Sequence, residues 1–209
     1  MIVKVVQSLS TERFGTYLTA AGRDQERALR LYLWNAQLGE AFHLPIQAVE
    51  VTLRNRINNA LVSKYGTDWW LHEAFLEIID IERKFDLITV QKRIRNRRLS
   101  LVTGQMVAGL SFGFWVGMLR KRYNPELWSS HLSRSFPDLP ESESRGSLLK
   151  AANGVALLRN RISHHEPIFK RDISADYAQM LALLKWLCPA THDWIRPHCR
   201  VAQMARCKP

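Results

Sequence analysis

The tripeptide Arg-Asn-Arg occurs three times in this chain of 209 residues, and its third copy is followed by two histidines. The copies span residues 54–56, 95–97 and 159–161. The residue five positions after the first arginine of each copy is Asn59, Ser100 and His164, respectively. Only an imidazole exchanges a proton near neutral pH, because its ordinary pKa is ~6.5. The third copy is therefore the one whose residues suit acid–base chemistry.

Arg159, Asn160 and His164 suit cleavage of RNA without a metal ion. Such cleavage needs a proton acceptor for the 2′-hydroxyl, a proton donor for the leaving 5′-oxygen and positive charge near the phosphorane. His164 suits the first two roles. Arg159 suits the third, because a guanidinium is always charged and matches phosphate oxygens in a bidentate way. Asn160 could orient the imidazole or bind a phosphate oxygen, and the products would be a 2′,3′-cyclic phosphate and a 5′-hydroxyl.

These three residues lie near the end of a helix expected over residues 147–166, which Pro167 terminates. Asn160 and His164 are four residues apart and stack on one face. Arg159 and His164 are separated by about 140° around an ideal helix, so they do not share a face. A common substrate therefore requires the long reach of the arginine, a local bend at the helix end, or a second chain.

Helical signals dominate the sequence, and no convincing alternating strand is present, so we expect an all-α fold. Ser10 and Asp24 are expected to cap the first two helices, and Ser174 a later one. The expected helices cover residues 10–22, 24–42, 45–65, 75–98, 103–119 and 147–166, with others after Asn124, over 176–188 and in the tail to about Cys207. His43-Leu44-Pro45 is expected to separate the second helix from the third, and residues 135–146 form the best loop.

The overall charge favours a polyanionic partner. Lys and Arg number 30 against 19 Asp and Glu, a formal net charge of +11, which suits a nucleic acid or an anionic membrane surface. The length fits a single domain over residues 1–209. Three cysteines without a signal peptide indicate reduced thiols and a cytoplasmic location.

Residues 99–119 carry no charge and are long enough to span a bilayer. Gly109, Gly113 and Gly117 repeat at the four-residue spacing found where membrane helices pack. The same spacing lets a soluble helix approach a neighbour closely, and the segment also contains polar residues. We therefore expect a buried central helix in preference to a membrane span.

Basic residues near the second copy could form a track for RNA, although such a run can also be a solvated face. They are Arg93, Arg95, Arg97, Arg98, Arg120, Lys121 and Arg122. In the first copy, Arg54 and Asn55 fit a structural role, since Glu50 lies one helical turn before Arg54 and can pair with it. The alternative is that Arg54 and Asn55 line the same cleft as the third copy.

Soft metal ligands gather in the tail but do not have the usual spacing of a zinc site. They are Cys188, His192, His198, Cys199 and Cys207. Prolines at 189 and 197 interrupt the set, and no Cys-x-x-Cys pair is present, so neither a metal nor a cofactor is expected.

Two segments carry a resemblance to a known family. RNRISHHEPIF (159–169) and LSFGFWVGMLRKRY (110–123) resemble the hallmarks of Abi-like proteins, the AbiD/AbiF type of bacterial abortive-infection factor. The run ALRLYLWNAQLGEAFHLPIQAVEVTLRNRINNAL, followed by YGTDWW, also fits. The resemblance covers about residues 8–187 and leaves 188–209 as a tail of unknown role.

Proteins of this type are similar to the HEPN superfamily, which implies a HEPN-like helical bundle with additional N-terminal helices. The resemblance assigns Arg159, Asn160 and His164 to the HEPN motif and allows His165 as an alternative histidine; Arg161 and Glu166 are secondary candidates. It implies a homodimeric endoribonuclease acting on RNA in phage defence or as the toxin of a toxin–antitoxin pair, controlled by an antitoxin protein or a regulatory RNA. A non-catalytic RNA-binding or regulatory module remains the alternative.

Overall fold

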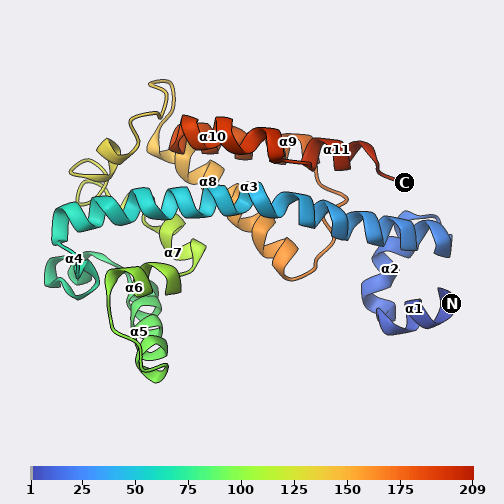
Figure 1. Cartoon of the computed structure of the whole chain (residues 1–209), viewed down its shortest axis with the longest axis horizontal. Coiled ribbons are helices and arrows are strands. Elements are labelled where there is room, and N and C mark those ends of the chain that lie inside the picture. Colours follow the sequence, from blue (N-terminus) through green and yellow to red (C-terminus); the bar gives the residue numbers. More distant parts are fainter. Residues whose placement is uncertain (1) are drawn as a thin grey trace.

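One helix of 41 residues, α3 (Gln25–Tyr65), runs along the long axis of the molecule, and the other elements pack around it (Figure 1). The computed structural model describes residues 2–209, and within them it contains helices and no strand, which confirms the expected all-α class. The remaining α-helices are α1 (Ile2–Ser8), α2 (Thr11–Ala20), α4 (Glu73–Ile78), α5 (Ile81–Asn96), α6 (Thr103–Gly109), α7 (Phe112–Gly117), α8 (Arg145–Ser163), α9 (Ile173–Leu187), α10 (Pro189–Ile195) and α11 (Val201–Arg206).

The continuity of α3 corrects the expected break at residues 43–45, because Pro45 lies inside the helix. A proline removes one backbone hydrogen bond and costs about 3 kcal/mol in a helix interior. Packing offsets that cost, since Leu38, Phe42, Ile46 and Val49 form one buried stripe that continues in register on both sides of Pro45. The stripe gives the helix the same core-facing side before and after the proline.

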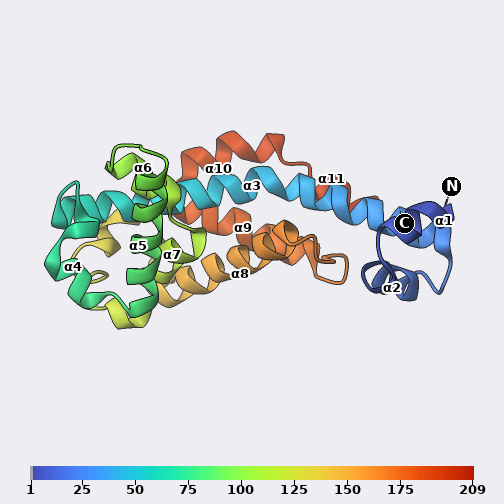
Figure 2. The ribbon, with the colours of Figure 1, turned by 90° about the horizontal axis from the view of Figure 1, so that it is seen from below.

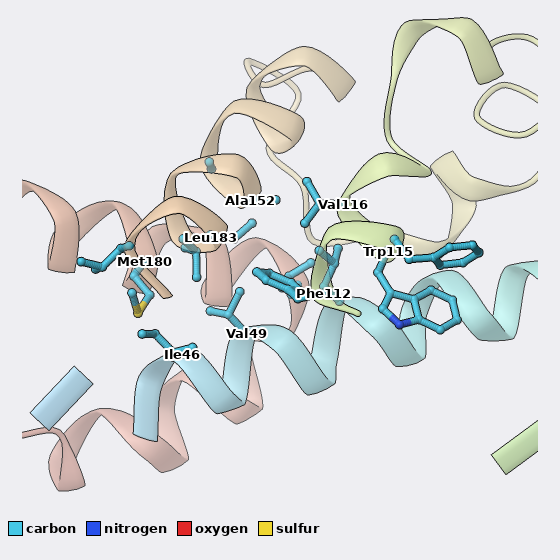
Figure 3. Packing of buried hydrophobic residues seen from close by; sticks show 14 of the residues in the cluster. Ile46, Val49, Phe112, Trp115, Val116, Ala152, Met180 and Leu183 are labelled. Carbon is cyan, nitrogen blue, oxygen red and sulfur yellow. The ribbon is translucent and has the colours of Figure 1, made fainter. Parts of the chain in front are cut away.

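The core lies where α3, α7, α8 and α9 meet. α9 packs along α3 and also against α8, while α7 packs against both α3 and α8. Figure 3 shows Ile46 and Val49 of α3 facing Met180 and Leu183 of α9, with Phe112 and Val116 of α7 alongside. α2 and α11 pack against the N-terminal half of α3, where the Trp34 indole N–H donates to Met204 O. This arrangement fixes α8 against α3, which matters because α8 carries the third Arg-Asn-Arg copy.

Several expected helix starts are confirmed by side-chain caps. Ser10 Oγ accepts from the backbone N–H of Arg13, and Asp24 accepts from that of Arg27. The expected cap at Ser174 is wrong, because α9 begins two residues earlier and Asp172 accepts from the N–H of Ala175. Each cap satisfies one of the N–H groups that a helix start leaves without a partner.

The single helix expected over residues 75–98 is two helices, because Asp80 interrupts it and caps α5. Its carboxylate accepts from the N–H of Arg83 at 3.0 Å and from the hydroxyl of Tyr123 at 2.9 Å. The Arg83 and Arg122 guanidiniums lie within 3.9 and 3.3 Å of it. Burial alone would raise the pKa of the Asp80 carboxyl. The hydrogen bonds and the neighbouring positive charges have the larger combined effect, so the pKa lies below its ordinary value.

The single apolar helix expected over residues 103–119 is also two short helices, α6 and α7, with Ser111 capping the second. Gly109 explains how α6 approaches α5, because a Cβ there would lie 2.5 Å from Val90 Cγ1. Across residues 2–209, every helix is too short or too polar to cross a bilayer. The buried position expected for this segment holds for α7, most of whose side chains are buried.

Two further expectations about short elements need correction. The residues after Asn124 form turns instead of a helix, between the 3-10 turns η2 (Lys121–Tyr123) and η3 (Leu132–Ser135). The tail is divided into α10, η4 (Arg196–His198) and α11 instead of one helix, and α11 ends next to Cys207 as expected.

Candidate functional site

The third Arg-Asn-Arg copy lies in the last two turns of α8, which ends at Ser163, earlier than the expected end at residue 166. His164 is the C-terminal cap, and His165 follows with φ of 55°, a left-handed conformation that glycine usually adopts here. The N–H of His165 donates to Ile162 O, and the N–H of Glu166 donates to Arg161 O. These two bonds are the Schellman pattern, so the local bend considered for the helix end is present immediately after the motif.

Two residues from distant parts of the chain hold the segment after His165 in place. The Asn35 side chain of α3, only 8% exposed, accepts from the backbone N–H groups of Ile168 and Phe169 at 2.8 and 3.1 Å. The Arg13 guanidinium donates to the carbonyl of His165 at 3.4 Å. Sequence reasoning did not identify Asn35, because an asparagine within an apolar helical stripe gives no sign of the backbone that it will bind.

Arg159 points from α8 toward α3 and pairs with Glu50. Its Nε lies 3.6 Å from Glu50 Oε2, and its Nη1 donates to Asn160 Oδ1 at 3.4 Å. This corrects the expected pairing of Glu50 with Arg54, because Glu50 pairs with Arg159 across the helices instead. Arg54 nevertheless lies near Arg159, since both line a cavity of about 250 Å³ between α3 and α8. The structure thereby brings the first arginine of the first copy and the first arginine of the third copy to one cavity.

His164 and Asn160 do not line that cavity, although Asn160 accepts a hydrogen bond from Arg159, which does. Both are exposed, and neither is among the residues that line the space beside Arg159. The separation of Arg159 from His164 around the helix is therefore retained in the fold. Of the secondary candidates, Arg161 and Glu166 pair with each other at 3.9 Å, and His165 lines a neighbouring cavity of about 600 Å³.

His43 of α3 is a residue of the cavity that sequence reasoning missed. It lines both the 250 Å³ cavity with Arg54 and Arg159 and the 600 Å³ cavity with His165. The signal that could have found it is spacing, because seven and eleven residues on a helix each return to within about 20° of the same direction. His43, Glu50 and Arg54 therefore share a face, but only if the helix continues through Pro45.

The basic residues considered as an RNA track form two groups. Arg93, Arg95, Arg97 and Arg98 are exposed at the end of α5. Arg120 and Arg122 instead pair with Asp80 at 3.9 and 3.3 Å, while Lys121 between them is exposed. Figures 1 and 2 place α5 at the end of the molecule near α4, whereas the C-terminal end of α8 lies toward α2. The structure thus does not join this track to the third copy.

The tail does not assemble a metal-binding cluster. Within residues 2–209, no group of three or more His, Cys, Asp or Glu side chains is arranged to hold a metal ion. Cys188 instead lines a cavity of about 580 Å³ between α3 and α10, together with Asn55. Hydrogen bonds from Thr191, chiefly from its hydroxyl, lower the pKa of the Cys188 thiol. Asn55 and Arg54 thus line different cavities, which corrects the alternative that both line the cleft of the third copy.

Comparison with models of protein families, with curated proteins and with solved structures gave no match. The site must therefore be interpreted from its own residues.

Proposed function

We propose that the chain is a metal-independent endoribonuclease that uses Arg159, Asn160 and His164. The observation that carries the proposal is the position of Arg159, whose guanidinium lines a cavity at the surface of α8 while remaining 41% exposed. A guanidinium in that position can bind a phosphate from solvent with N–H groups other than the Nε that faces Glu50. His164 is the C-terminal cap of the same helix, and its side chain is also exposed to solvent.

The chemistry requires each proton to be accounted for. The 2′-oxygen gives its proton to an imidazole and bonds to phosphorus. The bond from phosphorus to the 5′-oxygen then breaks, and that oxygen takes a proton from a second imidazole or from the first one. Arg159 offsets the extra negative charge of the phosphorane. The products are a 2′,3′-cyclic phosphate and a 5′-hydroxyl. We propose that this cleavage acts in phage defence or as the activity of a toxin.

A homodimer fits the exposed face of α8. Asn153, Leu157, Asn160 and His164 recur at helical spacing and are all exposed, and Leu157 is 62% exposed. In a two-fold dimer through this face, Leu157 would be the apolar contact between the two copies. If two chains pair through this face, both copies of Asn160 and His164 come together, which would supply the second imidazole.

Incubation of the purified protein with total RNA in EDTA tests the proposal. We expect cleavage with cyclic-phosphate ends that disappears in Arg159→Ala and in His164→Ala. Unchanged cleavage in both variants would refute the assignment of these residues.

The exposed arginines of α5 favour a second candidate, a non-catalytic module that binds RNA. Arg93, Arg95, Arg97 and Arg98 form a cationic end that needs no histidine to retain RNA. Salt-sensitive RNA binding by a protein that cleaves no RNA and is harmless on overexpression would favour this candidate over the nuclease.

A further inference from the structure

The cavity between α3 and α8 has the composition of an anion-binding site. Arg54 and Arg159 line it from opposite helices, and His43 and Glu50 also face it. Two guanidiniums and one carboxylate leave a formal charge of +1, which matches the single negative charge of a phosphodiester. Its volume, about 250 Å³, accommodates a phosphate group with its neighbouring oxygens.

Arg54 has hydrogen-bonding capacity that the surrounding side chains do not use. Its Nε is buried, and it has no hydrogen-bond partner within residues 2–209. A buried donor without a partner is destabilising, and for a charged group the effect is larger. Glu50, one turn away on α3, does not offset this cost because it pairs with Arg159. A phosphate in the cavity would give the Arg54 guanidinium the anionic partner that Glu50 does not supply.

We propose that this cavity binds the phosphate of an RNA chain, with Arg54 and Arg159 as its ligands and His43 as a proton-transfer residue beside it. The proposal rests on the endoribonuclease function and places an imidazole beside Arg54 and Arg159 within one chain. His43 takes the proton of the 2′-oxygen and returns it to the 5′-oxygen as the bond from that oxygen to phosphorus breaks. No metal, oxidant or further reactant is needed.

The adjoining cavity of about 600 Å³ provides space for the attached nucleoside. It shares His43 and Ile162 with the smaller cavity, so a phosphate bound beside Arg54 is adjacent to it. Tyr32 supplies an aromatic ring, and Glu40 supplies a hydrogen-bond acceptor for a base. A base enters such a cavity only when it is unstacked, which makes single-stranded RNA the expected substrate.

Binding of inorganic phosphate tests the site without any reliance on cleavage. In the proton–nitrogen NMR spectrum of the histidine side chains, we expect phosphate to shift the His43 signals but not those of the exposed His198. Arg54→Gln should weaken phosphate binding about 10- to 100-fold, and Glu50→Gln should strengthen it. Arg27→Gln is the matched control, because it removes one charge from an exposed position of α3 distant from the cavity.

The phosphate site is refuted if His43 does not respond, or if Arg27→Gln weakens binding as much as Arg54→Gln does. The catalytic role of His43 has a separate test in RNA cleavage. His43→Asn should lower kcat about 100-fold or more while KM and phosphate affinity stay within about threefold of the wild type. An unchanged kcat overturns that role. If the wild type cleaves no RNA, the nuclease proposal and the role of His43 fail together, and the phosphate titration still decides the binding site.

Discussion

The two adjacent histidines should respond in opposite ways to the same substitution. His165 has φ of 55°, a region where a side chain is strained and glycine is not, whereas His164 has φ of −90°. The Schellman bonds at His165 and the contact from Arg13 use only its backbone, so His165→Gly retains all of them. His164→Gly relieves no strain and only increases the freedom of the unfolded chain.

The expected magnitudes follow from these two conformations. Relief of left-handed strain should stabilise His165→Gly by about 1 kcal/mol, which for a protein of this size raises Tm by about 2–4 °C. His164→Gly should cost about 0.5–1 kcal/mol and lower Tm by about 1–4 °C.

Thermal unfolding followed by circular dichroism, with urea unfolding as a second measure, checks both values. A lower stability for His165→Gly would show that the left-handed residue is not a source of strain at this helix end. The same variant should be assayed for RNA cleavage, because a gain in stability with a loss of activity would identify His165 as a functional histidine.

Three other predictions concern the framework of the site. Asn35→Leu removes the acceptor from two buried backbone N–H groups and should cost about 3 kcal/mol, whereas Asn35→Asp retains an acceptor and should cost less in urea unfolding. Asp80→Asn should cost about 2–3 kcal/mol at pH 7 because it removes the buried negative charge that pairs with Arg83, Arg120 and Arg122. The folded protein lowers the pKa of Asp80. The stability difference between the wild type and Asp80→Asn is therefore complete above the unfolded-state pKa of about 3.9 and should shrink as the pH falls through the folded-state pKa. A stability difference that grows in acid would contradict this prediction. Leu157→Glu should convert a dimer into a monomer in sedimentation analysis, and an unchanged mass would place any dimer contact elsewhere.

The helical class and several helix starts could be predicted because they depend on local signals. Ser10 and Asp24 cap the helices that follow them, as their types suggest. The errors arise where packing outweighs a local signal. Pro45 would end an isolated helix, but the buried stripe around it keeps α3 continuous. In contrast, Asp80 and Ser111 interrupt expected helices by capping new ones, and α5 and α7 then take separate places in the core.

The candidate residues of α8 could be proposed from the sequence, because the types and spacing of Arg159, Asn160 and His164 make them candidates. The contacts that these residues make with other helices could not be predicted in the same way. His43 was missed because the expected break at residues 43–45 removed it from the helix that it shares with Arg54. The pairing of Glu50 with Arg159 could not be deduced either, because it depends on how α3 and α8 lie against each other.

The measurement that tests the nuclease proposal most directly uses two single-stranded RNA oligonucleotides in EDTA. They are identical except that one carries a single 2′-deoxynucleotide on the 5′ side of the bond that the protein cleaves. We expect the all-RNA strand to yield a 2′,3′-cyclic phosphate and a 5′-hydroxyl, and the substituted strand to resist cleavage at that bond. Equal cleavage of both strands, or 5′-phosphate products, would contradict the proposal.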